Sequence, residues 1–388
     1  MRILSVICKS LKEQLRSYWV LLLSLSMGPF FIFVYFLIME TSELKYTLMI
    51  VNNDKGLLAD GYTINYGDSL ISFFNSIKND TIAFPLIVHQ SDDSSAAVGA
   101  VKNKKADALI VINDSFSQTL QRKKTDDTVA VSGVEFIGDL TSTGYLVSAV
   151  WANEIVNEYA LLVTNSKRII GVKETALGTS ATAGGFDMIV PGILIVSLIM
   201  LMFTSSIAFV SEVENKTIMR LKLSKLTAVE FLSGISFVQL LVGIASVLLT
   251  LLTAILLGFN YSGSLTIMII IAGMTSFSII SFSLIIAAVV KSANEVLVVG
   301  NFPMFLFMFF TGAAFPLHSD PLFSIAGYPI NILGLMTPTH AISALNKTLI
   351  MDMDFQSIIP EVISILVLTI IYFLIGGIIF KRHHLKLS

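Results

Sequence analysis

Six long stretches without a single Asp, Glu, Lys, Arg or His dominate this sequence. They are Trp19–Met39, Met188–Val210, Phe231–Leu257, Leu265–Val290, Val296–Phe315 and Val362–Phe380. A helix needs about 20 apolar residues to cross the hydrocarbon core of a bilayer. Only 13% of the 388 residues are charged, against about 25% in soluble domains. The sequence therefore predicts an α-helical polytopic membrane protein with six transmembrane helices, the fifth interrupted by Asn301 and Pro303.

The distribution of Lys and Arg orients these helices. Segments 1–17, 211–230, 291–295 and 381–388 hold 12 Lys or Arg in 50 residues, whereas segments 258–264 and 316–361 hold only Lys347 in 53. Short loops rich in Lys and Arg stay in the cytoplasm. We expect a multi-pass protein of a prokaryotic cell membrane, with both termini cytoplasmic and residues 41–187 outside.

The N-terminal segment 1–17 has the pattern of an interfacial helix. Ile3, Ile7, Leu11 and Leu15 recur on one helical face, and basic residues lie on another. Such a helix lies flat at the cytoplasmic headgroups, before the first transmembrane helix at 18–40. A solvated basic tail is the alternative. The 18–40 helix is longer than a usual signal-peptide core and no cleavage pattern follows Met39, so we expect it to be retained.

Residues 41–187 predict an α/β domain inserted after the first transmembrane helix. Strands are expected at Tyr46–Val51, Phe84–His89, Ala108–Ile112 and Val129–Phe136. Helices are expected at Ser69–Ile77, at Ser94–Lys102, from Asp114 or Ser115 to about Gln121, and at Leu140–Val163. Alternation of strands and helices is typical of an α/β layer domain. The Gly171–Gly185 stretch then leads back to residues 188–388, the five-helix remainder of the membrane domain.

The sequence carries none of the catalytic motifs that we sought. It has no phosphate-binding G-x-x-x-x-G-K-[ST], no H-E-x-x-H and no G-x-S-x-G. Its five histidines are scattered, and its one cysteine, Cys8, excludes a multi-cysteine metal site. We expect no catalytic, cofactor or metal site on this chain, and no paired ionisable groups near the membrane surface.

Transport driven by an ion gradient is also disfavoured. Ion-coupled transporters usually keep ionisable residues inside the membrane, because these residues mark the ion pathway. The six apolar runs contain none. If the chain transports, its energy comes from a cytoplasmic partner, and 211–230 is the one internal cytoplasmic loop long enough to bind such a partner.

That loop resembles the signature of permease subunits of type-two ABC exporters. The matching residues are Glu212, Glu214, Thr217, Leu221, Ser224, Glu230 and Gly234. Lys216, Lys225 and Ile235 depart from the signature, where the family usually has Gly, Pro and Lys. The resemblance implies that Glu212–Leu226 is a coupling helix that docks on an ATPase.

Two further regions resemble the same family. In the outer segment 316–361 and just before it, Gly312, Pro316, Pro321, Pro338 and Ala344-Leu345 are similar to a family pattern that implies two re-entrant half-helices. In the inserted domain, Val51–Asp54 and Ala106–Ser117 look like the outer domain of the family's long members.

By that resemblance, the chain is the transmembrane permease of an ABC exporter for an amphipathic or hydrophobic compound such as a drug, antibiotic, peptide or lipid. It would pair with a second permease, identical or related, and with cytoplasmic ABC ATPase subunits that carry the ATP and magnesium. The substrate-binding residues are unknown. The alternative is a membrane-anchored sensor that signals through its cytoplasmic loop. A net charge of −2 gives no sign of nucleic-acid binding.

Overall fold

The computed structural model describes residues 2–41, 45–59, 62–80, 86–125, 133–166, 178, 184–215, 227–261, 263–314, 322–325 and 328–385. The chain divides into two compact units. The helical unit comprises Met1–Thr41 and Thr175–Ser388, and the α/β unit comprises Ser42–Glu174. The predicted Gly171–Gly185 connection lies almost wholly outside the described residues.

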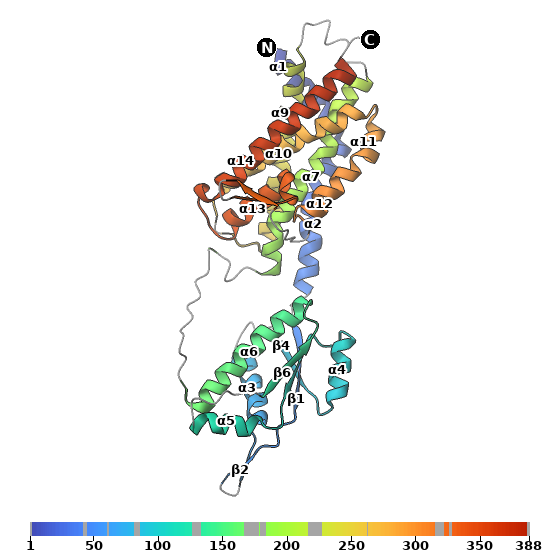
Figure 1. Ribbon diagram of the computed structural model, residues 1–388. Coiled ribbons are helices and arrows are strands. Elements are labelled where there is room, and N and C mark those ends of the chain that lie inside the picture. Colours follow the sequence, from blue (N-terminus) through green and yellow to red (C-terminus); the bar gives the residue numbers. More distant parts are fainter. Residues whose placement is uncertain are drawn as a thin grey trace. The chain divides into compact units, whose positions relative to one another are not determined.

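Long apolar helices make up most of the helical unit (Figure 1). Their bounds are Arg2–Arg16 (α1), Tyr18–Thr41 (α2), Gly185–Glu214 (α7), Ala228–Leu256 (α9), Leu265–Val289 (α10), Ala293–Val299 (α11), Asn301–Phe310 (α12), Thr337–Leu349 (α13) and Ile359–Phe380 (α14). Among the described residues, 6 helical segments are long and apolar enough to cross a membrane, with α11 and α12 together counted as one. They correspond to the six apolar runs of the sequence.

α7 is the most deeply buried of these helices and packs against α2, α9 and α10, while α10 also packs against α13 and α14. Lipid tails are as apolar as the side chains, so helices in a bilayer associate through close packing and small residues. Gly28 of α2 shows this, because a Cβ there would lie 2.7 Å from Ser197 Cβ. Buried hydroxyls bond back to their own helix, as Ser276 Oγ does to the Ala272 carbonyl at 2.7 Å.

The fifth apolar segment is split where the sequence is irregular. α11 ends at Val299 and α12 begins at Asn301, with Gly300 between them. Pro303 falls in the first turn of α12, where its missing N–H has no intrahelical partner to lose. The break therefore comes just before the proline and leaves both helices intact.

The outer segment 316–361 differs from the two half-helices that the resemblance implied. Its first apolar piece, Leu322–Ala326, contains strand β7 (Phe323–Ile325), which pairs antiparallel with β8 (Tyr328–Ile330). Its second piece, Ile330–Met336, starts at the last residue of β8 and continues into a 3₁₀ turn at Leu333–Leu335. The helix of this region is α13, and a second 3₁₀ turn at Phe355–Ile358 leads into α14. Pro329 lacks the N–H that helix continuation requires, and it disfavours helical backbone at the residue before it.

The α/β unit is built around a four-stranded sheet with the order β4-β1-β5-β6. The strands are β1 (Tyr46–Asn52), β4 (Leu86–Gln90), β5 (Ala108–Ile112) and β6 (Val134–Gly138). β1 runs parallel to β4 and β5, and β6 is antiparallel to β5. The helices are α3 (Tyr66–Asp80), α4 (Ser94–Lys102), α5 (Phe116–Thr125) and α6 (Thr143–Thr164).

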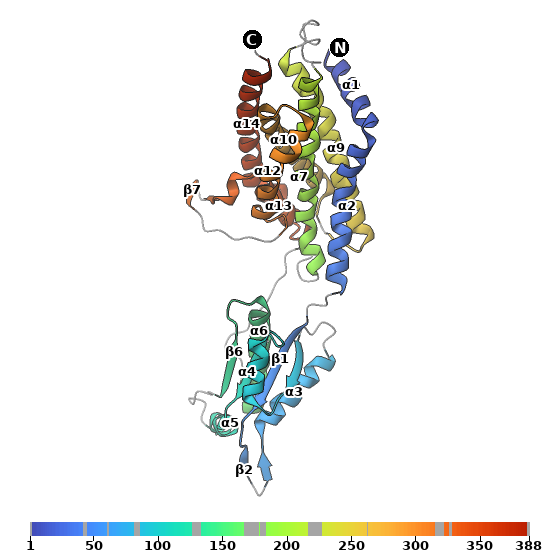
Figure 2. The same ribbon diagram turned by 90° about the vertical axis from the view of Figure 1, so that its right-hand side faces the viewer.

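Both faces of this sheet are covered (Figure 2). Leu48, Ile50 and Ile110 point to one face, where they join the core formed with α3, α5 and α6. Val51 and Leu109 point to the other face and pack against Ala97 of α4. Parallel strands that are buried on both faces have continuous apolar sequences, which explains why the strands at Ala108–Ile112 and Tyr46–Val51 could be predicted.

Two features of this unit differ from expectation. The fourth strand was expected at Val129–Phe136, whereas β6 begins at Val134, and residues 129–132 lie outside the described residues. A short antiparallel hairpin, β2 (Leu57–Ala59) with β3 (Tyr62–Ile64), was not expected. Its strands have 3 residues each, too few to show an alternating pattern.

Candidate functional site

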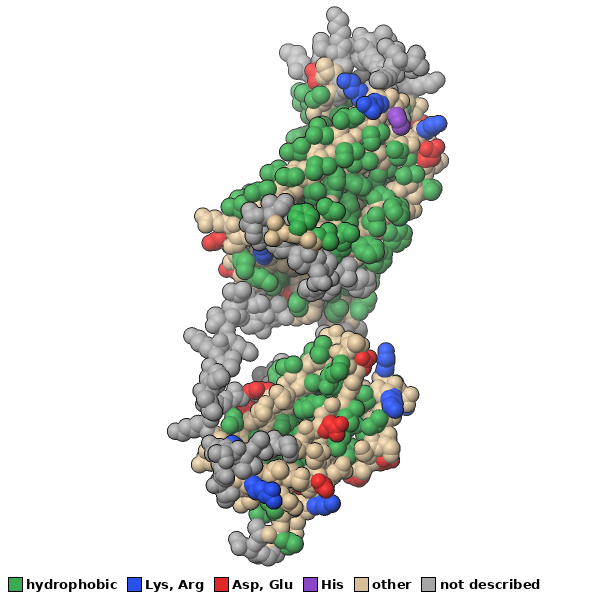
Figure 3. All heavy atoms as spheres, viewed as in Figure 1, with side chains coloured by type: hydrophobic (Ala, Val, Ile, Leu, Met, Phe, Trp, Pro, Cys, Tyr) green, Lys and Arg blue, Asp and Glu red, His purple; other side chains and the backbone are tan. Residues whose placement is uncertain are grey.

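The predicted coupling residues that the structure describes, Glu212, Glu214 and Glu230, lie at one end of the helical unit. α1, the last turn of α7, the first turn of α9 and the end of α14 meet there, and Figure 3 shows Lys, Arg and His side chains gathered beyond a broad apolar surface. We call it the basic end, after Lys9, Lys12, Arg16, Lys291 and Lys381. Thr217, Leu221 and Ser224 fall in segment 216–226, outside the described residues. Glu212, Glu214 and Glu230 flank it.

Glu212 joins α7 to α1. It lies in the last turn of α7 with a side chain only 8% exposed, and Lys9 Nζ of α1 lies 2.5 Å from its Oε1 and 2.7 Å from its Oε2. Charge-assisted contacts of this length are stronger than neutral hydrogen bonds. Loss of Lys9 would leave a buried carboxylate without a partner, so this pair fixes α1 on the end of α7.

Glu214 and Glu230 anchor the helices on either side. The Glu214 carboxylate accepts a hydrogen bond from the Ala293 N–H at 3.1 Å, at the start of α11. Glu230 completes a capping box with Thr227: Thr227 N–H donates to Glu230 Oε2 at 2.8 Å, and Glu230 N–H donates to Thr227 Oγ1 at 3.2 Å. This arrangement satisfies two otherwise unpaired N–H groups and fixes where α9 begins. The α7 flank of segment 216–226 is thus held to α1 and α11, and the capping box fixes the start of the α9 flank.

α1 packs closely on α9 through the glycine of the sequence signature. A Cβ on Gly234 would lie 2.6 Å from Val6 Cγ1, closer than side chains approach. Val6 is 6% exposed, and Gln239 of α9 donates to Gln14 Oε1 of α1 at 3.2 Å. Of the predicted apolar face of α1, Ile3, Leu11 and Leu15 stay exposed. The predicted apolar face is therefore available to lipid, and a different face of α1, which carries Val6 and Gln14, packs against α9.

A pocket of about 270 Å³ lies between α1, the start of α2 and the end of α7. Its lining residues are Ser10, Glu13, Gln14, Ser17, Val20, Thr204, Ile207, Ala208, Ser211, Glu212 and Asn215. Burial raises the pKa of Glu13, the Glu212 carboxylate adds to the rise, and Lys9, 3.5 Å away, opposes it. Two carboxylates here share one ammonium group.

Two of the four predicted outer residues, Gly312 and Pro338, lie among the described residues. Gly312 has a φ of +85°, a backbone conformation that favours glycine, and it follows the end of α12 at Phe310. Pro338 is buried in the first turn of α13, where proline is favoured. Pro316 and Pro321 lie outside the described residues.

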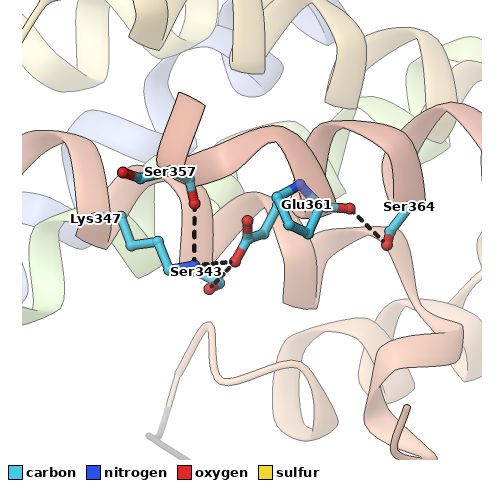
Figure 4. A network of polar contacts seen from close by, with 6 residues as sticks. Ser343, Lys347, Ser357, Glu361 and Ser364 are labelled. Atoms are coloured by element: carbon cyan, nitrogen blue, oxygen red, sulfur yellow. Dashed lines mark hydrogen bonds and ion pairs between the residues drawn. The ribbon is translucent and has the colours of Figure 1, made fainter. Parts of the chain in front are cut away.

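An ion pair that the sequence analysis missed joins α13 to α14 (Figure 4). Lys347 Nζ lies 2.6 Å from Glu361 Oε1, and the Glu361 side chain is only 2% exposed. Ser343 donates to the same oxygen at 3.1 Å. The expectation of no paired ionisable groups near the membrane surface is thus wrong, here and at Lys9–Glu212. The available signal was Lys347 itself, the single basic residue of the outer loops.

The two family-like segments of the α/β unit, Val51–Asp54 and Ala106–Ser117, contribute to a buried polar network. Asp54, 8% exposed, accepts hydrogen bonds from the N–H groups of Ser117 at 3.1 Å and Gly67 at 3.2 Å, and from the Ser117 hydroxyl. These donors belong to the first turns of α5 and α3, where a carboxylate is favoured by the helix dipoles. Asp107 likewise accepts from the Thr47 N–H at 2.7 Å. Within the described residues, no group of three or more His, Cys, Asp and Glu side chains could hold a metal ion.

Comparison with known proteins adds one match. The sequence profile of the ABC-2 family transporter protein matches residues 16–378, and hence α2 to α14 together with the α/β unit. No curated protein matches the chain.

Proposed function

The chain belongs to the ABC-2 family of transporter proteins, and from that premise we propose that it is the permease of an ABC exporter whose segment 212–226 couples ATP hydrolysis to transport. Membership makes it a membrane component of an ABC transporter, which associates with an ABC ATPase. Coupling, the export direction and the substrate class are our proposals. A family of transporters lends no support to the alternative of a ligand sensor.

The contacts around segment 216–226 carry the proposal. Glu212 is held by Lys9, Glu214 accepts from Ala293, and Glu230 caps α9. A push on the segment would therefore reach α1, α7, α9 and α11 together. A docked ATPase pair that closes on ATP would move these helices as a group and open a path between two permeases, identical or related.

The proposed orientation follows from the charges at the two ends. The basic end would face the cytoplasm with both termini, and the α/β unit and α13 would lie outside. Substrates would be amphipathic or hydrophobic compounds that enter from the inner leaflet or the cytoplasm. ATP and magnesium would bind the partner subunit, and this chain would have no ATPase activity of its own.

Replacement of Leu221 by Asp tests the coupling proposal. A carboxylate forced into an apolar groove of the ATPase costs several kcal/mol, and about 1.4 kcal/mol already lowers affinity tenfold. The variant should insert normally, lose co-purifying ATPase and lose transport, while Leu221→Met keeps both. Leu221→Asp protein that still retains the ATPase and exports substrate at wild-type levels would refute the proposal.

A further inference from the structure

The pocket at the basic end has the shape and chemistry of a headgroup site. One wall is a face of α1 that repeats every three or four residues, with Ser10, Glu13, Gln14 and Ser17. The facing wall is a similar face of α7, where Ser211 and Glu212, followed by the cap residue Asn215, come after Ile207 and Ala208, and Thr204 lies one turn earlier. The charged and most polar part of the pocket is therefore at the end of α7, while Val20, Ile207 and Ala208 line an apolar part that holds one hydroxyl, that of Thr204.

The charges that line this pocket do not balance. Glu13 and Glu212 both contact Lys9 Nζ, at 3.5 and 2.5 Å, so among the described residues two carboxylates share one ammonium group in a half-buried site. A bound cation would add a second positive charge beside them.

The size of the pocket limits what enters. A volume of about 270 Å³ lies below the roughly 300–1,000 Å³ of sites that enclose a drug-sized ligand. Tyr18 and Trp19, 55% and 69% exposed, lie beside the lining residues Ser17 and Val20. Exposed Tyr and Trp mark the headgroup depth of a bilayer. The pocket therefore admits a headgroup while the attached tail stays in the lipid.

We propose that this pocket binds the ammonium headgroup of an amphipathic molecule, with the ammonium at Glu13 and Glu212 and the tail leaving past Val20. Its role as the entry site of an exported amine or quaternary ammonium compound rests on the proposed function. Binding itself does not, and it is measurable without ATPase or transport. The ammonium can come from a single-chain cationic amphipath or from an aminophospholipid.

Trp19 provides a local probe, because Trp151 in the α/β unit is the only other tryptophan. In the full-length Trp151→Phe protein in a neutral maltoside detergent, bromoundecyl-trimethylammonium should quench Trp19 fluorescence with saturation. Glu13→Gln/Glu212→Gln should raise the half-saturating concentration at least tenfold. Glu295→Gln, which removes one charge at the same end outside the pocket, should leave it unchanged.

Two controls keep the test decisive. Ala208→Phe fills the pocket and leaves Lys9, Glu13 and Glu212 in the sequence, so it should abolish saturable quenching even if the double variant folds poorly. A neutral bromoundecyl maltoside should quench only in proportion to its partition into micelles. If the ammonium probe behaves like the maltoside, or if Ala208→Phe leaves saturation unchanged, the pocket is no ammonium site.

Competition identifies the source of the ammonium. Displacement of the probe by dodecyltrimethylammonium but not by short-chain phosphatidylethanolamine supports a single-chain cationic ligand, and the reverse result supports a lipid headgroup. The binding test and the coupling test can fail independently. If the ammonium probe binds saturably while the Leu221→Asp variant still retains the ATPase, the pocket proposal is supported and the coupling proposal is refuted.

Discussion

Asp54 and Asp114 of the α/β unit are the same residue type in opposite environments. Asp54 is buried and accepts from the first turns of two helices. Asp114 is 60% exposed and pairs at 3.1 Å with Lys55, itself 76% exposed. Since exposed ion pairs contribute about 0–1 kcal/mol and hydrogen bonds to buried charges about 1.5–3 kcal/mol each, their replacement should have very different effects.

We expect Asp54→Asn to destabilise the α/β unit by about 2–4 kcal/mol, because the new amide turns a donor toward N–H groups. Asp114→Asn should cost under about 1 kcal/mol. Hydrogen exchange of the β1 and β5 amides in the full-length protein measures both. Equal protection in the two variants would show that Asp54 does not hold α3 and α5.

The Lys347–Glu361 pair predicts an asymmetric loss of stability. Glu361 is 2% exposed and Lys347 31%, so Lys347→Met strands the more deeply buried charge. We expect Lys347→Met to lower the stability by about 3 kcal/mol and Glu361→Met to lower it clearly less. The double Met variant should recover most of the lost stability, because buried ion pairs can often be replaced by apolar residues. Thermal unfolding in detergent ranks the three variants by stability. A double variant as unstable as the sum of the singles would contradict it.

The sequence could predict which residues of these pairs are charged, but not which are buried together. Lys347 was visible as the single basic residue of the outer loops, and Glu361 directly precedes an apolar run. Their contact depends on α13 packing against α14, which no local pattern encodes. The role of Asp54 was likewise suggested only by family resemblance, because its donors lie 13 and 63 residues away.

Among the elements, α1 shows how far periodicity reaches. The spacing of Ile3, Ile7, Leu11 and Leu15 predicts the helix, and the structure places it at Arg2–Arg16. The face that binds α9 was not predicted, because Val6 and Gln14 carry no apolar repeat. The β7–β8 hairpin was missed for a related reason, since apolar pieces this short fit a strand as well as a half-helix.

Gly234→Leu should push α1 away from α9. In a Cys8→Ser background, a cysteine in place of Val6 is buried and should react slowly with a water-soluble maleimide. Addition of Gly234→Leu should raise its reaction rate at least tenfold, because the leucine occupies the space of that side chain. Gly273→Leu is the matched control, since a Cβ there meets nothing within 4 Å. An unchanged rate in the Gly234 variant would show that α1 does not depend on this contact.

At the scale of the whole molecule, the lengths of the apolar runs and the distribution of charge predict the architecture, although they do not predict how the individual helices pack. The division into a helical and an α/β unit, and the apolar helices themselves, follow from composition. The packing of α7 at the centre does not, because all six runs are similarly apolar. Orientation in the membrane stays a prediction that rests on Lys and Arg.

Impermeant thiol labelling tests that orientation. Cys8 is exposed and must first become Ser. A cysteine at Ser91 should then react from outside intact cells, whereas one at Ser224 should react only after the membrane is opened, because the distribution of Lys and Arg predicts that the two lie on opposite sides. Labelling of both from outside would overturn the proposed arrangement, and a permeant maleimide that labels both confirms that each site is reactive.

The packing of α2 sets an order for synthesis. Ile32 is fully buried, in the core that α2 forms with α7 and α9. These partners are translated about 150 to 220 residues later, roughly 10–45 s at ~5–20 residues per second. During that interval the α/β unit is synthesised, and α2 lies in the bilayer without the contacts that Gly28 later makes with α7 and α9. A cysteine at Ile32 should therefore react with a lipid-soluble maleimide in chains stalled before Gly185, and become protected once α9 is complete.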